Sequence, residues 1–209
     1  AKDCVEDAKS AIRWVRTNAA RLGVDPHRIV AAGGSAGGHL AACTALIPGF
    51  EAPNEDLTVS SMPNAMVLFN PALVLAPIPG LESAREGRRP DLNARLGTDP
   101  VALSPAHHVR SNLPPTIVFH GTADTTVPFS TAKLFADLMR QHGNRCELIP
   151  FEGAGHGFFN AGRSEHGYAD TLKATEAFLE SLGYLEGGAM PPPPSNAVPS
   201  AAKTTPTGS

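Results

Sequence analysis

The sequence has little cysteine, tryptophan or tyrosine: three, one and two, respectively, among 209 residues. The cysteines show no metal-ligand spacing and cannot all pair, so we interpret Cys4, Cys43 and Cys146 as buried thiols that leave the compartment open. No apolar run approaches the about 18 residues of a membrane span. The net charge of −3 gives no indication of binding to nucleic acid or to an anionic membrane surface.

The two ends of the chain differ in character. Residues 1–186 are long enough for one domain with a sizeable core. They open on "AKDCVEDAKSAIRWVR", which lacks the pattern of a signal peptide, and we expect the domain to be truncated at its N-terminus. Residues 187–209 contain "PPPP" and few large apolar residues, so we expect a disordered tail or linker. Localisation stays open, with a secreted or periplasmic location among the alternatives, and so does the oligomeric state.

Between the ends, short apolar runs alternate with segments of helical period. The apolar runs predict buried strands at 28–32, 64–70, 115–120 and 145–151. Apolar spacing of three and four predicts helices at 4–22, 39–46, 129–142 and 167–182, with a long surface excursion at 71–112 that contains one or two short helices. This alternation indicates an α/β fold, with a mostly parallel sheet and helices on both faces.

The stretch "GGSAGGHLAA" lies between the first predicted strand and the helix that follows. Residues 33–37 fit G-x-S-x-G, and this strand–turn–helix context is the one that a nucleophile elbow requires. A sharp turn would leave the Ser35 hydroxyl exposed, while Gly33 and Gly37 would let strand and helix approach without a Cβ clash. The Ala36 N–H would hold a developing oxyanion, and we assign Gly34 with it to oxyanion or substrate binding. The alternative is a structural Gly/Ser-rich loop.

A serine nucleophile needs a base, and the base needs an orienting acid. Asp124 follows the third predicted strand, and His156 follows the fourth within "EGAGHGFFN". The carboxyl ends of parallel strands meet at one edge of a sheet, where α/β proteins bind their ligands. The sequence therefore predicts Ser35, Asp124 and His156 as a catalytic triad.

Other acids and histidines compete for these roles. Among the acids, Asp91 and Asp99 lie in the surface excursion, and Glu152 is too near His156 in sequence to face its far ring nitrogen. Among the histidines, we expect surface, capping or packing roles for His39, His107, His108, His120, His142 and His166. No pair of histidines or carboxylates has ligand spacing, so we expect no metal and no cofactor.

Three segments carry a family resemblance: "DAKSAIRWVRTNAARLGVDPHRIVAAGGSAGGHLAA", "FHGTADTTVPF" and "FEGAGHGFF". Over about residues 3–184 the chain resembles the α/β-hydrolase superfamily, most closely its acetyl-xylan, feruloyl and lipase-like carboxylesterases. The resemblance implies Ser35 as nucleophile, Asp124 as acid, His156 as base and Ala36 as one oxyanion donor. The family also has upstream strands and a His-Gly-Gly-Gly type of loop that donates a second oxyanion N–H, and this sequence contains neither.

The function that follows is a serine carboxylesterase acting on short acyl esters, with acetyl esters of polysaccharides as one substrate class. Its partner would be a small-molecule or carbohydrate ester. Two alternatives stay open: a serine peptidase of the prolyl-oligopeptidase type, which "HGTADTTVP" also resembles, and a catalytically impaired hydrolase fragment.

Overall fold

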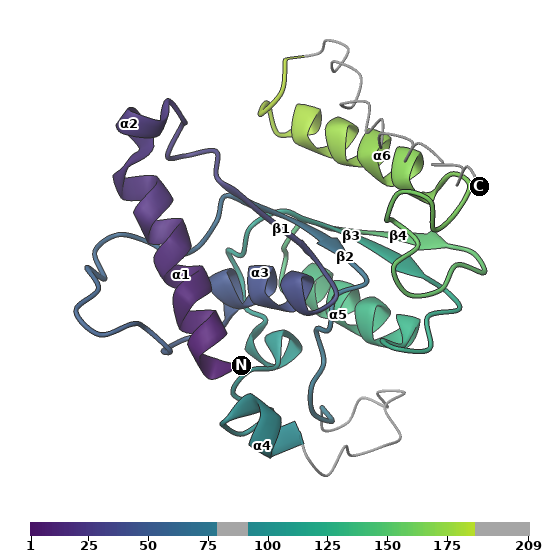
Figure 1. Ribbon diagram of the computed structural model, residues 1–209, viewed down its shortest axis with the longest axis horizontal. Helices are drawn as coiled ribbons and strands as arrows, with labels where there is room; N and C mark the ends of the chain where they lie inside the picture. Colours follow the sequence, from purple (N-terminus) through teal and green to yellow (C-terminus); the bar gives the residue numbers. More distant parts are fainter. Residues whose placement is uncertain (79–91, 187–209) are drawn as a thin grey trace, which may run out of the picture.

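The computed structural model describes residues 1–78 and 92–186 (Figure 1). Four strands of this part form one sheet in the order β1-β2-β3-β4, and all three pairings are parallel. The strands are β1 Val30–Gly34, β2 Ala65–Phe69, β3 Thr116–Gly121 and β4 Cys146–Phe151. The helices are α1 Lys2–Thr17, α2 Ala19–Leu22, α3 Ala36–Leu46, α4 Leu92–Leu96, α5 Phe129–Gln141 and α6 Gly167–Ser181, with a 3₁₀ turn, η1, at Pro105–His108.

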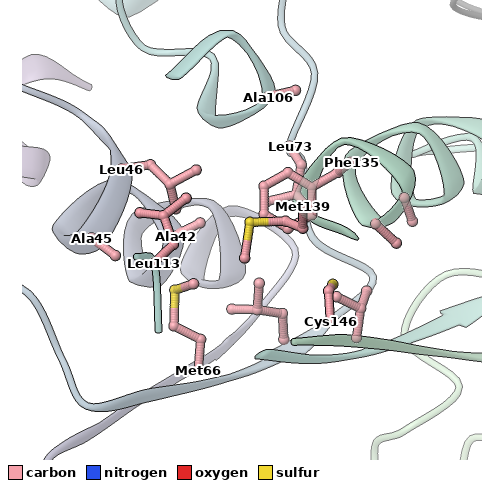
Figure 2. Close-up of a cluster of buried hydrophobic side chains, with 14 of the residues drawn as sticks. Ala42, Ala45, Leu46, Met66, Leu73, Ala106, Leu113, Phe135, Met139 and Cys146 are labelled. Atoms are coloured by element: carbon pink, nitrogen blue, oxygen red, sulfur yellow. The ribbon is translucent and has the colours of Figure 1, made fainter. Parts of the chain in front are cut away.

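Helices cover both faces of this sheet, with α3 and α5 on one face and α6 on the other (Figure 1). The alternation of side chains along a strand explains the two layers. On β2, Met66 and Leu68 pack into the core cluster that includes residues of α3 and α5, which Figure 2 shows in part. Ala65 and Val67 point the other way, into a cluster with Phe178 of α6. The predicted α/β architecture is confirmed.

Two predicted elements differ from the structure. The helix expected over 4–22 is interrupted at Asn18, whose side-chain Nδ2 donates to the Trp14 carbonyl 2.8 Å away and so competes with the helical backbone. The first strand runs over 30–34 instead of 28–32, because its parallel pairing with β2 continues through both glycines to Phe69. The other strands and helices agree with prediction to within one residue at each end, except that α3 begins at residue 36 instead of 39.

The cysteine prediction holds for two of three residues. Cys43 and Cys146 are buried, and burial raises the pKa of each thiol to about 12. Cys4 is exposed on α1, so its assignment as a buried thiol is wrong. The helical period that placed it on this segment does not place it on the inward face, which Val5 occupies.

The segment 71–112 carries α4 and η1, as expected, although its residues 79–91 lie outside the described residues. Its assignment to the surface is wrong in part, because Leu73, Leu103 and Ala106 are buried in the core clusters. The tail predicted at 187–209 also lies outside them. Within the described ranges, none of the helices has the length and apolar character needed to cross a bilayer.

A cluster of charged side chains joins α1 to the loop after α3, and we call it the salt-bridge cluster: Lys9, Arg13, Glu51 and Glu55. The Lys9 side chain is only 2 % exposed, and its Nζ lies 2.7 Å from Glu51 Oε1. Arg13 lies 2.7 Å from Glu51 and 3.4 Å from Glu55. Lys9 also donates to the Gly49 carbonyl, so this buried cation has both a carboxylate and a carbonyl as partners.

Candidate active site

Ser35 occupies the turn between β1 and α3 in a strained backbone conformation, with φ 55° and ψ −117°. A non-glycine residue there costs about 1–3 kcal/mol, and it persists only where the surroundings enforce it. The strand enforces it on one side, because the Ser35 N–H continues the ladder to the Phe69 carbonyl at 2.8 Å. The turn therefore has the sharp strand-to-helix geometry that the sequence predicted, at the end of β1, and the role of Ser35 as a nucleophile remains a prediction.

The glycines around the elbow divide their roles differently from the prediction. A Cβ on Gly33 would lie 2.4 Å from the Gly37 carbonyl carbon, so Gly33 is required for close approach, as expected. A Cβ on Gly37 would meet nothing within 4 Å among the described residues, so that part of the prediction is wrong. Gly38 takes this role, because a Cβ there would lie 2.9 Å from both the Gly33 carbonyl oxygen and the Pro71 side chain.

The three residues predicted as a triad meet at the carboxyl ends of their strands. His156 Nε2 lies 2.9 Å from Ser35 Oγ, and His156 Nδ1 lies 2.7 Å from Asp124 Oδ2. Since an ionised carboxylate only accepts, the Nδ1–H must donate to Asp124, which leaves Nε2 free to accept from the serine hydroxyl. This is the tautomer that a general base acting on Ser35 requires.

Asp124 is held as an anion by its own loop. Its Oδ1 accepts the N–H groups of Thr126 at 2.8 Å and Val127 at 2.9 Å. Burial alone would raise the pKa of this carboxyl, but hydrogen bonds from Val127, His156 and Thr126 outweigh burial, and the pKa lies below its usual value. The side chain is inaccessible to solvent, whereas the His156 ring is 25 % exposed. His156 therefore faces the open side of the site and Asp124 faces the interior.

The loop that carries His156 lies directly against two strand ends, and two glycines make room for it. A Cβ on Gly34 would come within 2.5 Å of the Phe159 ring, and one on Gly121 within 2.2 Å of the Ala154 carbonyl oxygen. Phe159 also packs against Phe69 of β2, with ring centroids 5.0 Å apart. Gly34 thus accommodates the histidine loop, and its predicted part in oxyanion or substrate binding remains a prediction.

Ala36 is the first residue of α3, immediately after the serine. The first N–H groups of a helix have no intrahelical partner, and they carry the positive end of the helix dipole. The Ala36 N–H belongs to this set, which matches what the stabilisation of an oxyanion beside Ser35 would need. Its role as an oxyanion donor remains a prediction.

The competing residues are engaged elsewhere or lie outside the described ranges. Glu152 accepts from Thr122 Oγ1 at 3.2 Å, and Asp99 accepts from the Val101 N–H at 3.0 Å. The His39 ring packs inward, with Nε2 2.8 Å from the Leu103 carbonyl oxygen, and burial lowers its pKa. Asp91 lies outside the described residues. Among those described, no three His, Cys, Asp or Glu side chains are grouped as metal ligands would be.

Two further side chains reach the acid. His120, expected mainly to pack, lies with Nε2 3.4 Å from Asp124 Oδ2. Asn70 Nδ2 lies 2.6 Å from the same oxygen, and the sequence reasoning missed it. The available signal was its place at the end of β2, between the strands that lead to Ser35 and Asp124, where an α/β sheet concentrates its functional side chains.

Comparisons with known proteins agree with this geometry. A sequence profile of the BD-FAE family matches residues 1–139. The probable carboxylic ester hydrolase LipM of Mycobacterium tuberculosis is 28 % identical, over 94 % of this chain and 47 % of its own length. The isoprenylcysteine alpha-carbonyl methylesterase ICME of Arabidopsis thaliana is 32 % identical, over 74 % of this chain and 39 % of its own length. The chain thus spans half or less of the length of these curated relatives.

Solved structures give a higher similarity. The apo form of Thermogutta terrifontis esterase 2 is 59 % identical, with a TM-score of 0.82, over 90 % of this chain and 68 % of that one. The same esterase phosphonylated by sarin has a TM-score of 0.86 at 57 % identity, over 90 % of this chain and 68 % of that one. The chain therefore belongs to the BD-FAE family, and its fold is that of the α/β-hydrolase esterases.

Proposed function

We propose that this chain carries the catalytic centre of a serine carboxylesterase. The observation that supports the proposal is the continuous hydrogen-bonded path from Ser35 Oγ through His156 to Asp124, with links of 2.9 and 2.7 Å. A serine hydroxyl is a weak nucleophile until a base takes its proton, and this path supplies that base in the required tautomer. Membership of the esterase fold supports an ester as the substrate.

In the proposed reaction, Ser35 Oγ attacks the ester carbonyl carbon while its proton passes to His156 Nε2. The carbonyl oxygen becomes an oxyanion, which the Ala36 N–H and the positive end of α3 stabilise. The intermediate collapses with cleavage of the ester C–O bond, and the imidazolium gives its proton to the departing alcohol. Water then enters, His156 takes one of its protons, and the resulting hydroxide attacks the acyl-enzyme carbonyl. The proton returns to Ser35 as the carboxylic acid is released.

We further propose short acyl groups as the substrate class, with acetyl esters of polysaccharides as one member. The support is the similarity to Thermogutta terrifontis esterase 2, whose structures include propionate-bound and butyrate-bound forms at 58 % identity to this chain. The same relatives favour an ester over the peptide substrate of a prolyl-oligopeptidase type of enzyme. Turnover should fall as the acyl chain of a p-nitrophenyl ester lengthens beyond butyrate.

The proposal is tested by labelling with a fluorophosphonate probe, which reacts only with an activated serine. The wild-type chain should label on Ser35 and hydrolyse p-nitrophenyl acetate. Ser35→Ala should abolish labelling and lower turnover about 10³-fold or more, because the members of a triad act as a unit. The Ser61→Ala variant is the control, since Ser61 lies in the loop before β2 and its hydroxyl donates to the Thr44 carbonyl, away from His156. Near-normal turnover by folded Ser35→Ala would overturn the assignment.

A further inference from the structure

Asn70 is a buried polar residue that the proposed mechanism does not use. It follows β2, it is 0 % exposed, and its Nδ2 lies 2.6 Å from Asp124 Oδ2. That oxygen is the one that accepts from His156 Nδ1 at 2.7 Å. One carboxylate oxygen therefore receives two N–H donors from different elements, while the other receives the backbone of its own loop.

His120 is the other side chain close to this oxygen, but its donor is already engaged. Its Nε2 lies 2.8 Å from the Val127 carbonyl oxygen, which requires an N–H, and 3.4 Å from Asp124 Oδ2. Its Nδ1 is buried without a hydrogen-bond partner among the described residues. Among the described side chains, Asn70 and His156 are thus the two at short hydrogen-bond distance from Asp124 Oδ2. The Nε2–H of His120 donates to Val127 instead.

The backbone of Asn70 is fixed on two sides. Its N–H donates to the Phe119 carbonyl at 2.8 Å, which continues the ladder between β2 and β3. The next residue, Pro71, rests on Gly38 of α3, which lies in the first turns after the nucleophile. Asn70 itself has φ 42°, a region that asparagine adopts more readily than most residues. Asn70 is therefore linked on one side, through Pro71, to the helix that follows Ser35, and on the other side, through its amide, to Asp124.

The orientation of the Asn70 side-chain amide favours a functional role over a purely structural one. Asn70 Oδ1 is buried and has no hydrogen-bond partner among the described residues. A buried acceptor without a partner is destabilising, so the side chain is not placed there for stability alone. Its Nδ2 is the half of the amide with a partner, and that partner is the carboxylate that orients the base.

We propose that Asn70 is a positioning residue for the catalytic acid: it fixes Asp124 Oδ2 against His156 Nδ1 and moderates the negative charge that the imidazole faces. This inference rests on the proposed function. Without the Asn70 donor, the carboxylate keeps its backbone bonds on Oδ1 but is free to rotate its Oδ2 away from His156. A misplacement of about 1 Å in a catalytic group can cost about 10²-fold in rate.

Two variants separate positioning from packing. Asn70→Gly removes the donor and tolerates the positive φ, and we expect kcat to fall about 10- to 100-fold with KM little changed. Asn70→Asp keeps the shape, and because two carboxyls this close share one proton, the new carboxyl can donate its O–H to Asp124 Oδ2 in place of the amide. We therefore expect Asn70→Asp to keep kcat within about threefold of wild type, where Asn70→Gly loses about 10- to 100-fold.

Asn144→Asp is the matched control. Asn144 is also a buried asparagine with two backbone partners, the Leu113 N–H and the Arg110 carbonyl, but it lies before β4, at the end of the strand remote from His156. Its substitution should lower the melting temperature without changing kcat of the folded protein. If folded Asn70→Gly keeps wild-type kcat, or if Asn70→Asp loses as much kcat as Asn70→Gly, the positioning role is wrong.

A measurement on the unaltered chain covers the case in which both Asn70 variants fail to fold. The side-chain amide of Asn70 in a ¹⁵N-correlated NMR spectrum should shift with pH at the midpoint seen for the His156 ring, and should shift again after phosphonylation of Ser35. An Asn70 amide that is indifferent to both would overturn the inference. If the wild-type chain does not label at Ser35 at all, the proposed function itself fails, which is a different outcome from unaltered Asn70 variants in an active enzyme.

Discussion

Within residues 1–78 and 92–186, two clusters of buried charge are built in opposite ways. In the salt-bridge cluster, two cations and two carboxylates face one another, so their formal charges cancel. At the strand ends, Asp124 is a single carboxylate surrounded by N–H donors and by histidines that carry no fixed charge. The first arrangement holds α1 in place. The second leaves a single negative charge beside His156, which is the arrangement that the proposed general base requires.

The sharpest test of this difference is to remove one carboxylate charge from each cluster without changing its shape. Asp124→Asn should lower kcat about 10⁴-fold, because an amide stabilises the wrong imidazole tautomer and no longer stabilises the imidazolium. Glu51→Gln should leave kcat of the folded protein within about twofold of wild type, by the same reasoning applied to a charge that never meets the substrate. Equal losses of kcat in the two variants would show that the salt-bridge cluster also serves catalysis.

The second prediction concerns stability: Glu51→Gln, which spares kcat, should lower the free energy of unfolding. Glu51→Gln leaves Lys9 and Arg13 with less compensation, and removing one partner of a buried pair typically costs about 3–5 kcal/mol. Because the Glu51 side chain is 25 % exposed, we expect a smaller loss of unfolding free energy, about 2–3 kcal/mol. Urea denaturation measures it, and the double variant Lys9→Met/Glu51→Leu should recover most of the loss. A single variant as stable as wild type would mean that solvent already screens the pair.

The third prediction concerns the close contact between Gly34 and the loop that carries His156. Gly34→Ala would force the Phe159 ring, 2.5 Å from the added Cβ, to move the loop that carries His156. We expect kcat to fall about 10- to 100-fold, with about 1–2 kcal/mol lost in stability from overpacking. Gly155→Ala, in the same loop, is the control, since its Cβ would meet nothing within 4 Å of the described residues. Equal effects of the two alanines would indicate loop stiffness instead of the contact.

The smallest predicted effect is a difference in the pH ranges over which the clusters lose stability. Burial lowers the pKa of His120, so the unfolded chain takes up a proton below about pH 6.5 that the fold refuses, and stability falls as pH falls from there. Burial would raise the pKa of Glu51, but Lys9 and Arg13 lower it below its usual value. Its contribution is therefore complete above about pH 4.3 and is lost below it.

Melting temperatures measured between pH 7 and pH 3 test these two ranges. His120→Gln should flatten the decline that begins near about pH 6.5, and Glu51→Gln should flatten only the decline below about pH 4.3. Each change in slope should correspond to about one proton or less per molecule. If Glu51→Gln flattened the upper range, the assignment of that range to a buried histidine would be wrong.

Sequence reasoning reached the parts of the site that depend on chain order. Ser35, Asp124 and His156 each follow an apolar run, and parallel strands bring such positions to one edge whatever the details of packing. It failed where the answer depends on a distant neighbour. Gly37 fits the motif, yet Gly38 is the residue that meets Pro71. Asn70 gave no sign of its partner, because its bond to Asp124 spans 54 residues.

The same limit applies to the first helix. The period of three and four predicted a helix over 4–22 but gave no reason to bury its lysine, yet Lys9 is only 2 % exposed. A lysine becomes a core residue only when a loop from elsewhere brings it a carboxylate, as residue 51 does here. Helical period describes one helix, and it holds no information about the charges that other segments deliver.

The distance along the chain between the base and the nucleophile has a kinetic consequence. His156 and Ser35 are 121 residues apart, and the strands that carry them to one another are the two ends of the four-stranded sheet. Contacts of such high sequence separation form late, after the chain entropy of the intervening loops has been lost. Until that contact forms, Ser35 has no base under the proposed mechanism. Under the proposed mechanism, the rate at which Ser35 becomes phosphonylated during refolding therefore measures how fast the sheet is completed.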